Sequence, residues 1–220
     1  MKYTSLIVIA LSLFVAACED PAANKPAATV SESVNSQPTA QPVNTAPKPE
    51  IRGDALAVAP DNSKIEFVGS KVTGKHDGGF NQFTGTIDLV NGKAEDSSVF
   101  VEIDMASVFT DADGLTEHLK KADFFDVEKF PKSSFRSTKI VADTAKGADS
   151  FNVAGDLTLH GVTRSISFPA TIKISEHEVM VNAEFSVNRK DFGINYAGMA
   201  NDLIRDLVVI KLDLKTPRKN

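Results

Sequence analysis

The chain contains four histidines, and histidine is a common choice both as a metal ligand and as a general base. His76, His118, His160 and His177 lie far apart in the sequence, and no two of them have the spacing of a helical His-Glu-x-x-His zinc site. A metal site would have to be assembled purely by folding. We therefore expect no bound metal.

A serine or threonine could act as a nucleophile with His118 or His160 as its base. However, the chain has no Gly-x-Ser-x-Gly elbow and no acidic residue at a diagnostic position. The run from Asp111 to Gly114 matches part of a calcium loop, but the twelfth position of that loop is Ala122 instead of glutamate. We predict that the protein is not an enzyme and has no catalytic residue.

The only cysteine of the chain, Cys18, follows an apolar run from Leu6 to Val15. This run is short for a membrane span, and the small residues Ala16 and Ala17 precede the cysteine, as in a secretory signal. The arrangement resembles the lipobox of a bacterial lipoprotein, in which the cysteine is acylated. We predict a signal peptide at residues 1–17 and a membrane anchor on Cys18, and leave open whether the inner or the outer membrane receives it.

Residues 18–60 differ in composition from everything that follows them. Proline, alanine, asparagine, serine and threonine dominate, and apolar residues do not recur with a helix or strand period. Such a segment is expected to be disordered, because it buries too little apolar surface to fold. We predict that it is a tether, and that residues 61–220 form one domain. The net charge of −5 comes with scattered basic residues, which argues against nucleic acid as a partner.

In residues 61–220, apolar residues recur at every second position, which predicts β-strands with one buried face. The pattern is clear in the segments 65–67, 83–89, 99–105, 151–159, 166–174, 179–187 and 208–214, and Phe135 marks an eighth strand. Turn sequences such as Asn91-Gly92 and His160-Gly161 make successive strands antiparallel neighbours. Eight such strands can form a sandwich or a barrel, and the pattern alone does not decide between them.

One helix is expected from about Asp113, with Leu115, Leu119 and Ala122 on its apolar side. It can cover one end of a barrel. Phe124, Phe125 and Phe130 follow it, and these aromatic residues form either the plug of a closed core or the rim of a ligand portal.

Three motifs resemble the YceI-like family of bacterial envelope proteins. They are LTEHLKKADFFDVEKFP at residues 115–131, LTLHGVTRSISF at 157–168 and RKDFG at 189–193. The resemblance implies an all-β fold, an antiparallel eight-stranded lipocalin-like barrel with a short capping helix, which encloses a long apolar ligand. That ligand would be a polyisoprenoid, a quinone-like tail or a fatty-acyl chain.

The expected apolar cavity and portal residues are those that alternate inward on the strands and those near the helix. They are Phe67, Phe83, Ile87, Val101, Ile103, Leu119, Phe124, Phe125, Phe135, Leu157, Leu159, Phe168, Ile172, Phe185, Phe192 and Ile210. His160 and Arg189 are candidates for contact with a polar head group. The alternative for these two is structural: His160 shapes a turn, and Arg189 pairs with Asp191 on a strand or with loop backbone.

We therefore expect a lipoprotein that faces the periplasm and sequesters or carries an isoprenoid-type lipid, with no other cofactor. Relatives suggest a role in stress responses. An interaction module with a filled barrel is the main alternative, and a lipid-modifying enzyme is a weaker one. An edge strand or the Phe-rich rim could also mediate a homodimer, which would leave no mark in the sequence.

Overall fold

The computed structural model describes residues 20–33, 50–200 and 202–218. The predicted signal peptide and Cys18 lie outside the described residues. The described helices are all too short to cross a bilayer.

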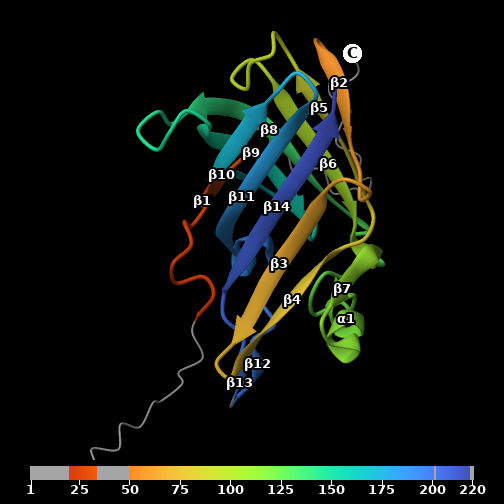
Figure 1. The fold of residues 1–220 in the computed structure, drawn as a ribbon. Helices are drawn as coiled ribbons and strands as arrows, with labels where there is room; N and C mark the ends of the chain where they lie inside the picture. Colours follow the sequence, from red (N-terminus) through yellow and green to blue (C-terminus); the bar gives the residue numbers. More distant parts are fainter. Residues whose placement is uncertain (1–19, 34–49, 201, 219–220) are drawn as a thin grey trace, which may run out of the picture.

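The fold is one strongly curled antiparallel sheet with a short helix at one end (Figure 1). The hydrogen-bonded order of its strands is β2-β5-β6-β8-β9-β10-β11-β14-β3-β4-β7, and β1 pairs with β10 beside this path. The strands are β1 (Thr29–Glu32), β2 (Asp54–Val58), β3 (Lys64–Lys71), β4 (Gly74–Phe80), β5 (Phe83–Leu89), β6 (Ser98–Asp104), β7 (Val108–Thr110), β8 (Lys132–Ala142), β9 (Ser150–Leu159), β10 (Val162–Ile174), β11 (Glu178–Asn188) and β14 (Leu207–Pro217). A separate small hairpin consists of β12 (Gly198–Met199) and β13 (Asp202–Leu203).

Each of the seven segments that alternate in the sequence is a strand, and so is the segment marked by Phe135, but the count of eight is wrong. The main sheet has twelve strands and curls into a half-barrel. Strand β4 was missed because its sequence, GKHDGGF, has no alternating apolar residues. Its glycines have a packing reason: a Cβ atom on Gly78 would lie 2.5 Å from the Phe67 ring.

The predicted tether is also wrong for two described segments. Strand β2 lies at residues 54–58 and pairs with β5, and the buried Asp88 accepts hydrogen bonds from the backbone N–H groups of Arg52 and Gly53 just before it. Strand β1 pairs with β10 through four residue pairs. Composition did not predict these strands, because a segment can pair through its backbone with the edge of a formed sheet even when its own sequence has no apolar period.

Strand β1 fills an opening between β10 and β11. These two strands pair with each other only over Thr171–Ile174 and Asn182–Val179, near their shared turn. Beyond that point β1 pairs with β10 at residues 164–167, and Ala27 forms a parallel bridge with Ser186 of β11. The N-terminal segment thus completes the sheet where β10 and β11 separate.

The turns follow the sequence signals. Asn91 and Gly92 have φ of 54° and 64°, and His160 and Gly161 have φ of 51° and 73°. Both pairs have left-handed backbone, for which glycine is favoured. His160 and Gly161 form a two-residue turn between antiparallel strands, whereas Asn91 and Gly92 lie in the longer connection between β5 and β6. The two-residue turn joins β9 to β10 and holds the His160 side chain at the surface of the sheet.

The predicted helix is present as α1 (Asp113–Leu119), and it covers the end of the half-barrel near β7 (Figure 1). Leu119 is buried and Leu115 is half-buried, as expected. Ala122 lies beyond the end of the helix and is exposed, so its predicted place on the apolar side is wrong.

Candidate functional site

The inner faces of the strands enclose an elongated apolar cavity of about 380 Å³. This volume lies within the range of small-molecule binding pockets, about 300–1,000 Å³. The lining side chains that were not expected from the sequence to contact a ligand include Ile65, Phe80, Val99, Met105, Leu115, Ile140, Val153, Ile166, Val181, Val187, Ile194, Ile204, Val208, Leu212 and Leu214.

The cavity runs along the length of the central strands. On β14, the lining residues are Val208, Ile210, Leu212 and Leu214. Six residue steps at about 3.3 Å each span about 20 Å. A chain-like ligand therefore fits this shape better than a compact one.

The two ends of the cavity differ in burial. At one end its lining residues Ile65, Ile140, Ile172 and Leu214 are all buried. At the other end the lining includes Lys71, whose side chain is 37% exposed. His76 is 36% exposed at the same end, which we call the open end. The β12–β13 hairpin lies at this end, because Lys71 forms an isolated bridge with Ile204, the residue after β13.

Aromatic rings define the middle of the cavity. Phe168 and Phe185 stack with ring centroids 4.1 Å apart, and Phe135 packs against Phe168 at 5.6 Å. Gly155 makes room for this group, because a Cβ atom there would lie 2.5 Å from the Phe135 ring. The small residue thus positions a large aromatic side chain against the cavity.

The helix and the residues after it form the wall at the open end. Leu119, Phe124 and Phe125 line the cavity there, and Phe124 packs against Tyr196 at 5.0 Å. Phe130 does not line the cavity. Instead its ring packs on His160, with centroids 4.8 Å apart. Only two of the three phenylalanines therefore belong to the cavity wall.

Most of the predicted cavity residues line the cavity. These are Phe67, Val101, Ile103, Leu119, Phe124, Phe125, Phe135, Leu157, Leu159, Phe168, Ile172, Phe185 and Ile210. Phe83, Ile87 and Phe192 do not, which corrects their predicted position. All three are buried in the packed core, Phe83 and Ile87 on β5 and Phe192 on the short 3-10 helix η2 (Arg189–Phe192).

His160 also lies outside the cavity lining. Its Nδ1 atom is 3.2 Å from the carbonyl oxygen of Phe192, so the imidazole links the β9–β10 turn to helix η2. The structural alternative for this residue is the one that the geometry supports. The predicted contact with a ligand head group has no support from the position of the ring.

Arg189 lies on helix η2, so its predicted place on a strand is wrong, and Asp191 is not among its partners. The side chain is 5% exposed. Its guanidinium donates hydrogen bonds to the carbonyl oxygens of Arg205, Ile194 and Ile204 at 3.1, 2.6 and 3.4 Å. Burial lowers its pKa from the usual value, and the carboxylate of Asp206 opposes that shift.

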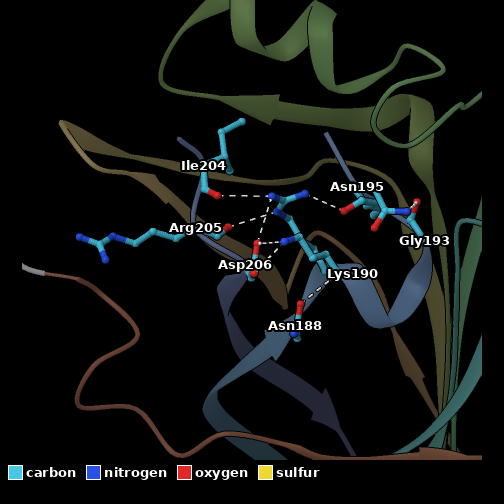
Figure 2. Close-up of polar contacts among 9 residues, drawn as sticks. Asn188, Lys190, Gly193, Asn195, Ile204, Arg205 and Asp206 are labelled. Atoms are coloured by element: carbon cyan, nitrogen blue, oxygen red, sulfur yellow. Dashed lines mark hydrogen bonds and ion pairs between the residues drawn. The ribbon is translucent and has the colours of Figure 1, made fainter. Parts of the chain in front are cut away.

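The Arg189 contacts join two loops. Figure 2 shows Ile204, Arg205 and Asp206 on one side and Lys190 and Asn195 on the other, with dashed lines crossing between them. Arg189 borders the cavity, but most of its N–H groups are already donated to protein oxygens. It acts as a structural tie between helix η2 and the segment before β14.

Three other polar side chains that line the cavity, Lys71, His76 and Ser133, have protein partners, whereas the buried Ser70 Oγ has no hydrogen-bond partner in the part of the chain that the structure describes. Lys71 Nζ donates to Asp202 Oδ2 at 2.5 Å, and Ser133 Oγ donates to the carbonyl oxygen of Thr158 at 2.7 Å. His76 Nδ1 lies 2.8 Å from Asp111 Oδ1, and this hydrogen bond holds the pKa of Asp111 below its usual value. Within the described residues, no group of histidine, aspartate, glutamate or cysteine side chains could hold a metal ion.

Several cavity residues were not named from the sequence as ligand contacts although their strands were expected. Val153 and Val181 lie on strands and Met105 directly follows β6, and the same period of two in the sequence would have identified all three. Ile194 and Ile204 lie in segments without any period, and only tertiary structure brings them to the cavity.

The model of the YceI-like domain matches residues 56–216. A UPF0312 protein of Pseudomonas putida (strain W619) is 34% identical over 133 residues, which cover 58% of this chain and 68% of the relative.

Two solved structures have similar folds. BcnA of Burkholderia cenocepacia has a TM-score of 0.61 and 24% identity, over 70% of this chain and 95% of that one. A polyisoprenoid binding domain from Saccharophagus degradans has a TM-score of 0.58 and 19% identity, over 76% of this chain and all of that one.

Proposed function

The chain belongs to the YceI-like family, and from this premise we propose that its half-barrel binds a long apolar lipid. The lipid is of the polyisoprenoid, quinone-like or fatty-acyl class, and the protein sequesters or carries it in the bacterial cell envelope. The acylated Cys18 holds the protein on a membrane, with the barrel in the periplasm. The similar fold of a domain described as polyisoprenoid-binding supports this class of ligand.

The observation that carries the proposal is the elongated cavity, whose lining is mainly aliphatic and aromatic and contains few polar groups. Its aliphatic and aromatic walls extend from Leu214 at the buried end to Lys71 at the open end. Such a site selects a ligand by length and apolar surface, because few polar groups remain for directional contacts. A polar head group would stay at the open end, close to water.

Burial of apolar surface is enough for useful affinity. Each buried methylene contributes about 0.8 kcal/mol, so a five-carbon isoprene unit contributes roughly 4 kcal/mol before the cost of ordering the chain. A few buried units therefore compensate for the loss of translational and conformational freedom. Binding of this kind needs no catalytic residue.

The two alternatives have less support. An interaction module with a filled barrel would leave no room for a ligand, whereas the half-barrel has a cavity of about 380 Å³. A lipid-modifying enzyme would need a reactive polar group in that cavity. His160 and Arg189, the two candidates for contact with a polar head group, are bonded to backbone carbonyl groups.

The first test is native mass spectrometry of the full chain, purified from bacterial membranes in a mild detergent, followed by solvent extraction. We expect a stoichiometric adduct whose extracted mass fits a prenyl or acyl chain. A clean unliganded mass, with no uptake of added prenyl alcohols or fatty acids, would reject the proposal.

A pair of neighbouring substitutions on β9 provides the matched control. Val153 is buried and lines the cavity, whereas the side chain of Asn152 is exposed. We expect Val153→Trp to fill the cavity and to lower the amount of bound lipid at least several-fold, while Asn152→Trp leaves it unchanged. Val153→Phe is a smaller change for use if the tryptophan variant does not fold, and circular dichroism checks the fold of each variant.

A further inference from the structure

The N-terminal segment at residues 20–33, which we call the strap, is attached along the outside of the half-barrel. Its β1 strand pairs with β10, Pro26 and Ala28 bond to the backbone of Ser186, and Ser33 Oγ lies 3.1 Å from Asp156 Oδ1. Lys25 Nζ also pairs with Glu184 Oε2 at 2.8 Å. These contacts fix the position and the direction of the strap on the outside of the sheet.

The start of the strap lies at the open end of the cavity. Ala22 is 4% exposed and packs with Val68 of β3 and Val209 of β14 on the outer face. Asp20 Oδ2 accepts from Arg205 Nη1 at 3.3 Å. Arg205 follows Ile204, a cavity residue, and its backbone N–H donates to the carbonyl oxygen of Ser70. In Figure 1 the red segment accordingly descends from β1 toward the end where β12 and β13 lie.

This position limits where the anchored residue can be. Cys18 is two residues before Asp20. Two residues of extended chain span at most about 7 Å. The acyl chains on Cys18 would therefore begin close to Arg205 and the open end, and far from the buried end of the cavity.

The same end carries an exposed apolar group, which we call the tip. Val72, Met199 and Leu203 are 56%, 68% and 50% exposed. They come from the β3–β4 turn and the β12–β13 hairpin, which are joined by a hydrogen bond from Val72 N–H to the carbonyl oxygen of Leu203. Apolar side chains that are clustered and exposed mark a contact surface.

We propose that the strap holds the open end of the half-barrel against the membrane in which Cys18 is anchored, with the tip in contact with the lipid surface. The ligand then passes between bilayer and cavity without crossing bulk water. This inference rests on the proposed function, since it requires both the lipid anchor and a lipid ligand. It replaces the free tether that composition predicts with a fixed orientation.

The charges around the tip support an apolar contact. Lys71 pairs with Asp202, Lys190 with Asp206, and Arg205 with Asp20. Because these cations are paired with carboxylates, an excess of positive charge toward anionic lipid is not expected. Contact of the tip with the membrane should therefore depend little on salt.

The test uses the lipidated full chain in vesicles of phosphatidylethanolamine and phosphatidylglycerol. Acylation consumes the thiol of Cys18, so a single introduced cysteine can be labelled with an environment-sensitive fluorophore. Met199→Cys and Leu203→Cys report on the tip. Lys146→Cys is the control, because its turn between β8 and β9 lies near the buried end, where Asp149 bonds to the cavity residue Ile172.

We expect label fluorescence at residues 199 and 203 to shift to the blue and to be quenched by lipids that carry a spin label, and the label at residue 146 to stay in water. Equal exposure of all three positions would overturn the proposal. So would an intact mass that shows no acyl groups on Cys18. Extraction of bound ligand from the same samples separates this failure from failure of the proposed function.

Two adjacent strap substitutions test the cause of the orientation. Ala22→Glu places a charge against Val68 and Val209 and should detach the strap. The labels at residues 199 and 146 should then no longer differ in fluorescence or in quenching. Ala23 is exposed, and Ala23→Glu should keep the difference. If both variants keep it, the strap does not orient the barrel.

Discussion

Arg189 shows how a buried charge can serve as a tie between loops. Its guanidinium is bonded to the carbonyl oxygens of Arg205, Ile194 and Ile204, and Asp206 lies 3.4 Å from Nη2. A buried cation is stable only when its N–H groups are donated to such acceptors. The residue therefore contributes to the open end of the cavity through the loops that it holds.

Replacement of Arg189 by alanine should destabilise the protein. Several buried carbonyl groups would lose their donor, so we expect the free energy of unfolding to fall by about 2–4 kcal/mol. The measurement is urea unfolding followed by circular dichroism. Lys190→Ala is the control, because Lys190 is exposed and also pairs with Asp206, and an exposed pair contributes only about 0–1 kcal/mol. Equal losses in the two variants would contradict the role assigned to Arg189.

Asp202 ties the β12–β13 hairpin to the β3–β4 turn. Its carboxylate accepts from Lys71 Nζ and from the Thr73 hydroxyl, and these contacts lower its pKa from the usual value. Because the pKa is lower in the folded state, the contribution is complete above the unfolded value and is lost as the pH falls through the folded value. The hairpin should therefore loosen only in acid.

This expectation can be followed at the Val72 amide, which is bonded to Leu203. We expect its NMR chemical shift to stay constant at neutral pH and to change as the pH falls below about 3.8, the usual value for aspartate. Asp202→Asn should remove this acid transition, whereas Asp213→Asn, near the other end of β14, should retain it. If the acid transition is unchanged in Asp202→Asn, another titrating group causes it.

Among the strands, β1 is the one whose role is least visible in its sequence. It fills the space between β10 and β11, and the residues before it cover Val68 and Val209 on the outer face. Both valines break the alternation of their strands, since each follows an inward apolar neighbour, Phe67 or Val208. Two successive apolar residues in a strand indicate that its outer face is also covered.

Deletion of residues 20–33 should therefore lower stability. We expect a loss of about 2–4 kcal/mol in the free energy of unfolding, because two valines become exposed and the edge of β10 loses its partner. Hydrogen exchange should become faster at the amides of β10 that face β1. A chain with the same strap residues in scrambled order is the control for composition, and it should behave like the deletion. If the deletion leaves the free energy of unfolding unchanged, residues 20–33 are a tether without a structural role.

The complete half-barrel combines a packed core with an apolar cavity, and this combination has a thermodynamic consequence. The core around Phe83, Ile87 and Phe192 supports the fold, while the cavity wall loses packing contacts wherever no ligand is present. A ligand that binds only the folded state shifts the folding equilibrium toward it.

Lipid removal should therefore lower the melting temperature. A ligand at a hundred times its dissociation constant adds about 2.7 kcal/mol of stability, which is roughly 5–10 °C for a domain of this size. Scanning calorimetry of protein purified with its lipid, extracted, and then reloaded with a prenyl alcohol measures the shift. Val153→Trp should show little shift, because the indole occupies the cavity. A shift of equal size in this variant would place the ligand elsewhere.

Alternation along the chain was enough to predict seven of the central strands and the inward direction of their side chains, Phe135 marked the eighth, and helical spacing predicted the helix that begins at Asp113. These features could be read because period, turn chemistry and helical spacing are local properties. The cavity residues Phe135, Leu157 and Ile210 follow from the same period. Membership of the YceI-like family was also visible, in three motifs.

The remaining features depend on contacts between distant segments. Glycine-rich β4 is a strand because β3 pairs with it, and residues 29–32 are a strand because β10 and β11 separate there. Phe83 lies on an alternating strand and Phe192 lies in a family motif, so both were expected at the cavity. The tertiary structure places both in the packed core instead. Whether an inward side chain meets a neighbour or an empty space is decided by how the whole sheet closes, and no local pattern carries that information.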